Sequence, residues 1–284
     1  MDNAISINDL KKEYKQFLLD SISFDVPRGY ITGFIGPNGS GKTTTIKSIL
    51  SYIRPDGGII KVLDEEVAED NTYLEKIGVV MDAPFLVKDW SVKDVEKSLK
   101  PFYTKWDSEA FHMYLTKFKI HETLKVKELS RGMTVKLMIG IALSHGAELL
   151  VLDEPTSGLD PVAREEICEI LQEFVEDEKH SVFFSTHITS DLEEIADYII
   201  FLINGKIVYK GEKDNLMENY ILIKGGMREL ESLDQNKLIG IRKHATGFEA
   251  VSLKADSINL REEFIIEPIS LEKLIIFFNR GEFR

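Results

Sequence analysis

A glycine-rich segment near the start of the chain has the residue types needed to bind phosphate. Residues 36–43 read GPNGSGKT, which fits the P-loop pattern Gly-x-x-x-x-Gly-Lys-Ser/Thr. Glycines let the backbone curl so that successive N–H groups face phosphate oxygens, and a helix that begins there adds its positive dipole end. Lys42 can bring a charge to the β- and γ-phosphates, and the Thr43 hydroxyl can bind Mg²⁺. The residues expected to contact the phosphate-bearing ligand are Asn38, Gly39, Ser40, Gly41, Lys42, Thr43 and Thr44.

Two adjacent carboxylates form the second chemical group. The apolar run 149–152 (LLVL) leads into Asp153 and Glu154, and Asp153 follows Lys42 by 111 residues. An apolar strand would deliver both carboxylates to its C-terminal end, where α/β sheets bind their ligands. There Asp153 suits a role in holding hydrated Mg²⁺, and Glu154 can polarise a water for in-line attack on a γ-phosphate. An isolated Asp-Glu pair is more often solvated surface charge, but the apolar run and the P-loop favour the functional interpretation.

One histidine can join these groups. His187 follows a β-branched and aromatic segment, 181–185, that is typical of a strand. A lone histidine is more often structural, but a strand lying next to the one before Glu154 would bring this ring to the same edge of the sheet. We therefore expect Lys42, Glu154 and His187 to be catalytic.

Alternating apolar runs and helical stretches must position these residues. This alternation predicts an α/β fold: a P-loop NTPase core with a mostly parallel sheet, an antiparallel β edge, a helical subdomain and a small C-terminal α+β appendage. The predicted strands are 30–35, 59–62, 77–81, 149–152 and 181–185, and the predicted helices are 42–52, 161–175 and 190–196. Segments 198–203 and 207–210 flank Asn204-Gly205 and predict a β-hairpin, whereas 84–146 is predicted to be helical.

The composition of the chain changes after about Tyr220. We predict a main domain at 1–220, with the helical subdomain at about 83–146, and a small accessory domain at 221–284. The tail has β-like pieces at 221–223, 238–241, 248–253 and 264–266. Its last helix is expected to begin near Ser270, which is a suitable N-cap.

Composition and charge exclude several classes of protein. The 284 residues include 35 Lys+Arg and 48 Asp+Glu, a net charge of −13, which argues against a protein that coats nucleic acid. The apolar runs are far shorter than the roughly 20 residues that a spanning helix needs, and we expect no signal peptide. The one cysteine, Cys168, cannot form an internal disulfide, which is typical of a reducing cytoplasm. We expect it to be a small buried hydrophobe.

Over residues 3–220 these motifs resemble the ATPase subunit of an ABC transporter. Residues 129–133 (LSRGM) lie at the position of the family's LSGGQ signature, between the P-loop and the strand that ends in Asp153. Residues 157–160 (SGLD) match the D-loop, and His187 matches the switch histidine. Tyr14 lies where the family has an aromatic ring that stacks on adenine. The resemblance therefore rests on several motifs in the family's order.

The resemblance implies a two-subunit mechanism that uses ATP and Mg²⁺. Two ATPase subunits, identical or different, would pair head to tail and hold each ATP between the P-loop of one and the signature of the other. Ser130, Gly132 and Asp160 would contact ATP across that interface. Closure and opening of the pair would drive a separate integral membrane permease. The chain would then be peripheral, on the cytoplasmic side of the membrane, and would bind no nucleic acid.

Three residues depart from the family pattern. Arg131 and Met133 replace the usual Gly and Gln of the signature, and Asp82 occupies the position where the Q-loop Gln is common. A carboxylate at position 82 can bind Mg²⁺ directly or through water, but it cannot donate a hydrogen bond while ionised. We expect altered hydrolysis kinetics. Arg131 either points to solvent or contacts phosphate or the partner subunit, and the sequence leaves both open.

Other functions compete with the transporter ATPase. A soluble ABC-type ATPase of translation usually has two cassettes, and one of DNA repair has a long coiled coil for which 111 residues leave no room. The altered signature leaves open a nucleotide-sensing regulatory ATPase with weak or no hydrolysis. The intact Lys42, Asp153, Glu154 and His187 argue against it.

Finer features are similar to those of one transporter class. Segments 129–133 and 185–189 (STHIT) and the small tail resemble bacterial exporters of peptide antibiotics and amphipathic peptides, including exporters of phenol-soluble modulins. Phe85, Leu86 and Trp90 could form a groove that receives a helix of the permease. Ordinary core packing explains these three side chains equally well.

Overall fold

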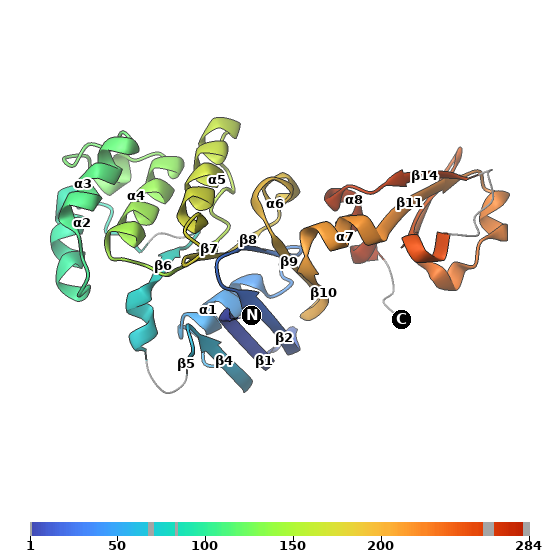
Figure 1. Ribbon diagram of the computed structural model, residues 1–284, viewed down its shortest axis with the longest axis horizontal. Helices are drawn as coiled ribbons and strands as arrows, with labels where there is room; N and C mark the ends of the chain where they lie inside the picture. The colour runs from blue at the N-terminus through green and yellow to red at the C-terminus, as the bar shows by residue number, and fades with distance from the viewer. Residues whose placement is uncertain (1, 68–70, 83–84, 258–263, 281–284) are drawn as a thin grey trace. The chain divides into compact units, whose positions relative to one another are not determined.

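The computed structural model describes residues 2–67, 71–82, 85–257 and 264–280. The chain divides into two compact units, Met1–Lys210 and Gly211–Arg284 (Figure 1). This boundary lies ten residues before the expected one at 220. The difference arises because helix α7 (Lys213–Asn219), which the sequence pattern did not predict, belongs to the second unit.

A mostly parallel sheet forms the centre of the first unit. Its strands are β3 (Ile31–Ile35), β6 (Ile77–Val80), β7 (Leu149–Asp153), β8 (Ser181–Thr186), β9 (Tyr198–Ile203) and β10 (Lys206–Glu212). Their order is β10-β9-β3-β8-β7-β6, with β3 parallel to β8 and β9, and β7 parallel to β6 and β8. Every residue of β3, β7 and β8 is buried, as expected for strands covered on both faces. The predicted parallel core is confirmed.

The turn between β9 and β10 confirms the predicted hairpin. Asn204 and Gly205 both have left-handed backbones, with φ of +48° and +74°. Two consecutive residues with positive φ are typical of the tight turns that join neighbouring antiparallel strands.

Three helices follow strands of this sheet. They are α1 (Lys42–Ile49), α5 (Pro161–Val175) and α6 (Thr189–Ile195). Helix α5 has the predicted bounds, whereas α1 ends three residues before the predicted Tyr52. The early end coincides with Ser51, whose φ of +58° is incompatible with a continuing helix. Cys168 lies on α5 and is fully buried, and burial raises the pKa of its thiol to about 12. The predicted role of a buried hydrophobe is therefore confirmed.

An antiparallel sheet, formed by strands from either side of β3 in the sequence, flanks the parallel one. It comprises β2 (Phe17–Pro27), β1 (Asn3–Tyr14), β4 (Gly57–Val62) and β5 (Glu65–Glu66), in that spatial order. Only β4 was predicted as a separate strand. Register shifts interrupt the pairing of β1 with β2, and Asp9 has a φ of +50°. These bulges break the apolar alternation that would have revealed β1 in the sequence.

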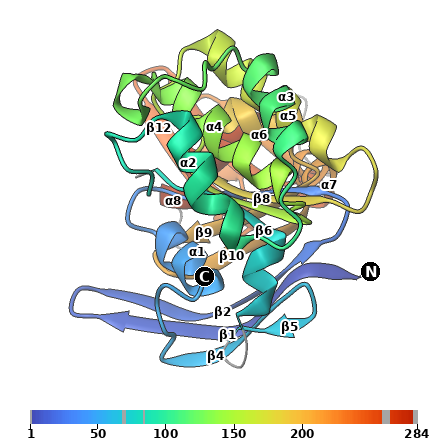
Figure 2. The same cartoon turned by 90° about the vertical axis from the view of Figure 1, so that its left-hand side faces the viewer.

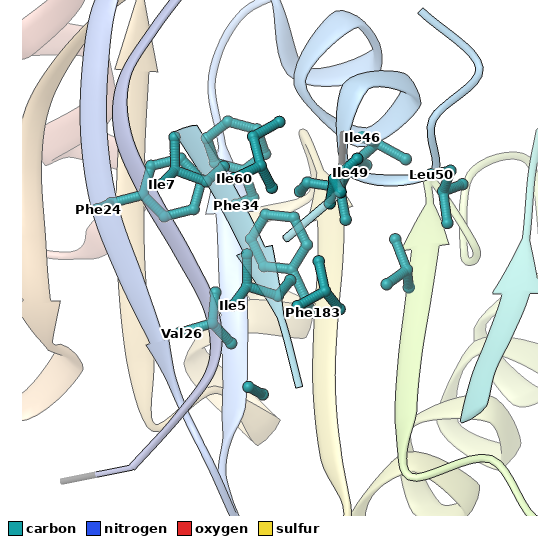
Figure 3. Close-up of a cluster of buried hydrophobic side chains, with 14 of the residues drawn as sticks. Ile5, Ile7, Phe24, Val26, Phe34, Ile46, Ile49, Leu50, Ile60 and Phe183 are labelled. Atoms are coloured by element: carbon teal, nitrogen blue, oxygen red, sulfur yellow. The ribbon is translucent and has the colours of Figure 1, made fainter. Parts of the chain in front are cut away.

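The main core lies between the two sheets around α1 (Figures 2 and 3). Ile5 and Ile7 of β1, Phe24 of β2, Phe34 of β3 and Phe183 of β8 contribute to it. The aromatic centroids of Phe34 and Phe183 are 5.3 Å apart, within the range of favourable ring pairs. This core anchors β3 and α1, and therefore the loop between them.

The segment after β6 is helical, as predicted. It contains α2 (Val92–Leu99), α3 (Ser108–Lys117) and α4 (Arg131–Ser144), which lie together in Figure 1. Positions 83 and 84, where this segment was expected to begin, lie outside the described residues. A Cβ at Gly78 of β6 would meet Ala142 Cβ at 2.4 Å, so the glycine allows α4 to approach the sheet closely. Among the described residues, no helix is both long and apolar enough to cross a membrane.

The second unit has its own sheet and core. Strands β11 (Tyr220–Gly225), β12 (Leu238–His244), β13 (Gly247–Leu253) and β14 (Ile265–Pro268) are arranged in the order β12-β13-β11-β14. Helix α8 (Leu271–Arg280) packs against β12 and β13. The Lys273 amide donates a 3.3 Å hydrogen bond to Ser270 Oγ, which confirms the predicted N-cap.

Candidate active site

The glycine-rich loop joins β3 to α1, and its glycines are required by space. A Cβ at Gly36 would lie 2.1 Å from the Leu202 carbonyl oxygen. At Gly41, where φ is +112°, a Cβ would lie 2.7 Å from Phe17 Cζ. The backbone can therefore curl over the end of the sheet only because these positions lack side chains. Gly41 is also the N-cap of α1, so the positive end of that helix faces the loop.

Lys42 is held inside the loop rather than in solvent. Its side chain is 6% exposed, and its Nζ donates a 2.7 Å hydrogen bond to the Gly36 carbonyl. The same nitrogen lies 3.5 Å from Glu154 Oε1. Among the described residues, the buried Ser40 Oγ has no hydrogen-bond partner. A buried hydroxyl without a partner in the same loop is suited to an incoming phosphate oxygen.

Asp153 ends β7 and is fixed by hydroxyl groups from two other elements. Its Oδ2 accepts a 3.0 Å hydrogen bond from Thr43 Oγ1, and its Oδ1 accepts one of 2.6 Å from Ser185 Oγ of β8. Asp153 and Thr43 thus bring oxygen donors together, as Mg²⁺ prefers. No cluster of three or more His, Cys, Asp or Glu side chains suited to a metal occurs in the described residues.

Glu154 occupies a strained position at the end of the same strand. Its φ is +53°, which is uncommon for a residue with a side chain. Its backbone N–H donates to the Ser185 carbonyl, at 3.1 Å, and so holds the turn against β8. Nδ1 of His187 lies 2.6 Å from Glu154 Oε2, where an ionised carboxylate accepts the hydrogen bond from the ring N–H. The carboxylate therefore lies between the ammonium of Lys42 and the imidazole.

Lys42, Glu154 and His187 line one cleft of about 490 Å³ in the first unit, whereas Asp153 does not line it and is connected to it through its hydrogen bond with Thr43. The predicted residues that line it are Tyr14, Asn38, Gly39, Ser40, Gly41, Lys42, Thr43, Thr44, Asp82, Glu154 and His187. Phe17 and Ser157 also line it and were not predicted. The ring centroid of Phe17 lies 6.5 Å from that of Tyr14, which is 44% exposed at the rim. In the sequence, the feature that could have indicated Phe17 is its position as a second aromatic residue, three positions after Tyr14.

A buried aspartate supports the residues around Glu154 and was not predicted. Asp191 of α6 is fully buried, and its Oδ2 accepts a 2.5 Å hydrogen bond from Thr156 Oγ1. Arg164 Nε of α5 lies 3.6 Å from the other carboxylate oxygen. Burial raises the pKa of Asp191 above its ordinary value, against the lowering effect of Thr156 and Arg164. Asp191 thus ties the helix after His187 to the turn after Glu154.

Three predicted contacts for ATP lie outside this cleft. Ser130 is the N-cap of α4, and its Oγ accepts a 3.2 Å hydrogen bond from the Met133 amide. Asp160 is the N-cap of α5 and accepts a 3.0 Å hydrogen bond from the Ala163 amide. Gly132 is buried, and a Cβ there would lie 3.4 Å from Ala163 Cβ. Their predicted contacts are with the nucleotide of a second subunit, and those contacts remain predictions.

Arg131 contacts another side chain of this chain and is still 44% exposed to solvent, and its predicted contact with phosphate or a partner subunit remains a prediction. Its guanidinium NH2 lies 2.5 Å from Asp82 Oδ1, so two of the three departures from the family pattern contact each other. Its side chain also approaches the D-loop, since its Nε lies 3.6 Å from where a Cβ on Gly158 would be. The metal-binding role predicted for Asp82 remains a prediction.

Comparison with known proteins gives a consistent family assignment. A family model described as ABC transporter matches residues 19–157. The lantibiotic transport ATP-binding protein SrtF of Streptococcus pyogenes is 33% identical over 238 residues, which cover 83% of this chain and 97% of SrtF. The bacitracin transport ATP-binding protein BcrA of Bacillus licheniformis is 31% identical, with 84% of this chain and 78% of BcrA covered. A solved ATP-binding subunit of an ABC transporter superposes with a TM-score of 0.68 at 27% identity, covering 75% of this chain and 91% of that one.

Proposed function

Because this chain belongs to the ABC transporter family as an ATP-binding subunit with ATPase activity, we propose that it powers export of peptides or peptide antibiotics through a separate permease. The observation that carries the catalytic part is the series of contacts from Lys42 through Glu154 to His187. It joins the phosphate-binding loop to the catalytic carboxylate within one cleft. The names of SrtF and BcrA, which refer to lantibiotic and bacitracin transport, support the substrate class.

Each residue of the series has a separate role in hydrolysis. Lys42 neutralises charge on the β- and γ-phosphates, with its ammonium already held at the loop. Glu154 orients the attacking water and accepts its proton, which requires an ionised carboxylate. His187 fixes the orientation of that carboxylate through Nδ1. Tyr14 stacks on the adenine at the rim of the cleft, next to the backbone N–H groups of the loop.

The oxygen donors of the cleft fit Mg²⁺. Thr43 and Asp153 are the residues that would hold it, with their oxygens 3.0 Å apart, and Asp82 lines the same cleft. When bound, Mg²⁺ would neutralise charge on the phosphate oxygens. Ser185 keeps the Asp153 carboxylate oriented for this role.

The ATP site is completed by a second ATPase subunit, which is either a copy of this chain or a related one. Ser130, Gly132 and Asp160 of one subunit contact the ATP that is held by the P-loop of the other. The cap of α4 supports this, because an exposed Ser130 Oγ and the N-terminus of the helix form a surface suited to a phosphate. Each chain thus supplies the P-loop half of one ATP site and the signature half of the other.

The permease contacts the start of the helical segment, on the cytoplasmic side of the membrane. Phe85 is 54% exposed, Val87 45% and Trp90 39%, whereas Leu86 is 8% exposed and belongs to the core. Neighbouring exposed apolar side chains of this kind are typical of an interaction site. Leu86 is therefore excluded from the contact, and Phe85 and Trp90 remain in it.

The catalytic proposal is tested with Glu154→Gln in the full-length chain. We expect hydrolysis to fall by about 100-fold or more, because the amide cannot accept the proton, while ATP binding persists. An ATP-dependent dimer should then accumulate in size-exclusion chromatography. Glu173→Gln, on the surface of α5, is the matched control for the change of charge. Undiminished hydrolysis in Glu154→Gln would show that the catalytic assignment is wrong.

The permease proposal is tested by purifying the tagged chain from membranes of cells that produce it. An integral membrane protein should copurify, and Phe85→Ala with Trp90→Ala should reduce its amount. Met113→Ala, on α3 and 56% exposed, should not. Equal recovery with and without the aromatic residues would locate the contact elsewhere.

A further inference from the structure

An ion pair links the two parts of the first unit that must respond to nucleotide. Asp82 follows β6, whose neighbour β7 ends in Asp153, and Arg131 is the first residue of α4. The Arg131 NH2 to Asp82 Oδ1 distance is 2.5 Å. The Arg131 and Asp82 side chains are 44% and 61% exposed. An ion pair with this much solvent contributes little stability, so it can exchange partners readily.

Helix polarity explains why Arg131 needs a carboxylate. A cation at the N-terminus of a helix faces the positive end of the helix dipole, which is unfavourable. The first turn of α4 contains no acidic residue. Asp82 supplies the missing negative charge from a different element. Asp82 and Arg131, two of the three residues that depart from the family pattern, therefore offset each other's charge at this position.

The Asp82 carboxylate also faces the catalytic groups. Asp82 lines the P-loop cleft together with Thr43 and Glu154. It also lines a second cavity of about 240 Å³, which Arg131, Asp153 and Glu154 share. Three carboxylates thus line this second cavity, and two of them, those of Asp82 and Glu154, also line the P-loop cleft. One of them, that of Asp82, is already paired with the cation of Arg131, and a bound metal would compete with that cation for it.

We propose that Arg131 is a positioning residue that acts through Asp82. The ion pair holds the carboxylate toward α4, so the Mg²⁺ concentration required for nucleotide binding is set by competition between the guanidinium and the metal. When Asp82 turns to the metal, the N-terminus of α4 loses its internal anion. This inference rests on the proposed function of the cleft.

The test measures the Mg²⁺ concentration that gives half-maximal binding of a fluorescent ATP analogue to the full-length chain. Neither hydrolysis nor a permease is required. Arg131→Gln should lower this concentration by about two- to fivefold, the range expected for losing an exposed ion pair. Arg131→Lys should retain part of the wild-type requirement. In the Asp82→Asn background, Arg131→Gln should have no further effect.

Lys136→Gln is the matched control, because Lys136 is another α4 cation in an ion pair, with Glu166 of α5. It changes the net charge equally and should leave the Mg²⁺ requirement at the wild-type value. An unchanged requirement in Arg131→Gln, or the same shift with and without Asp82, would overturn the inference alone. A wild-type chain that binds no nucleotide would overturn the proposed function as well.

Discussion

The phosphate-binding cleft and the N-terminal ends of α4 and α5 differ in how far one chain completes them. At the cleft, Lys42 is buried, as is Asp153 behind Thr43, and each contacts a group from another element. At the helix ends, Ser130 and Asp160 are exposed, and their side chains accept hydrogen bonds from the first turns of their own helices. The cleft is therefore preorganised by the fold, whereas the helix ends provide a surface for another molecule.

This difference is expected if each chain supplies unequal halves of a shared site. Preorganised charges in a partly buried site need no rearrangement when phosphate arrives, so they suit the catalytic half. The N-terminal caps of α4 and α5 are hydrated in the single chain, so they carry no desolvation penalty there. They can bind an anion that another molecule supplies. The predictions below test this contrast in order of decreasing expected effect.

The largest effect is expected when the two halves are disabled in separate chains. Lys42→Ala removes the buried ammonium, and Ser130→Asp keeps an N-cap but sets a negative charge against phosphate. Each should lower hydrolysis by about 100- to 1,000-fold. In an equimolar mixture of the two, half of the dimers are mixed and each has one intact site, so about one quarter of the sites should be active. The readout is ATPase rate; a mixture no better than its components would contradict the shared site.

The opposite end of α4 should make the fold sensitive to acid. His145, the C-cap of α4, is 2% exposed and stacks on Tyr103 with centroids 4.0 Å apart. Burial lowers the pKa of His145 from 6.5 to about 4. Below pH 6.5 the unfolded chain takes up a proton that the folded chain refuses, so stability falls as the pH drops toward 4. This group alone should cost about 3 kcal/mol of unfolding free energy over that range.

Denaturant unfolding at pH 7 and pH 5 measures the effect of His145. His145→Gln, which cannot titrate, should be less stable at pH 7 but should lose less stability on acidification than the wild type. Equal losses in the two proteins would show that His145 does not contribute to acid sensitivity.

A moderate effect is expected from the hydroxyl that fixes Asp153. Ser185→Ala removes the 2.6 Å hydrogen bond to Oδ1 and leaves the β8 backbone intact. Loss of a partner of this kind typically lowers metal affinity by about 10- to 100-fold. We therefore expect the Mg²⁺ concentration needed for nucleotide binding to rise within that range. Ser48→Ala is the control, because Ser48 is also buried but donates to the Thr44 carbonyl within α1. Similar behaviour of the two variants would contradict the preorganisation of Asp153.

The smallest effect is expected at the rim of the cleft. Tyr14→Ala removes a ring that is 44% exposed, and loss of one base-stacking contact should weaken ATP binding by about tenfold. Tyr14→Phe keeps the ring and should bind as the wild type does. Tyr52→Ala, an exposed tyrosine outside the cleft, controls for surface effects. Equilibrium titration with ATP measures the difference, and unaltered affinity in Tyr14→Ala would exclude stacking at this residue.

Much of the fold could be predicted because it is encoded locally. The buried strands β3, β7 and β8 are short apolar runs, and Pro161 is the first residue of α5, a position that proline favours. The bulged β1 and the helix α7 could not be predicted, because their apolar periodicity is broken or brief. The order of strands in the sheet also could not be predicted, because it joins segments that are distant in the sequence.

The sequence by itself predicted the chemistry that we propose: a loop for phosphate, hydroxyl and carboxylate oxygens for Mg²⁺, and a glutamate and a histidine for hydrolysis. These residues lie in contiguous motifs, so their types and spacing suffice to identify them. Only the tertiary structure decided which groups support them. Ser185 reaches Asp153, Asp191 reaches Thr156, and Arg131 reaches Asp82 across strand and helix pairings far apart in the chain. Such contacts depend on strand order and helix packing, which local patterns do not specify.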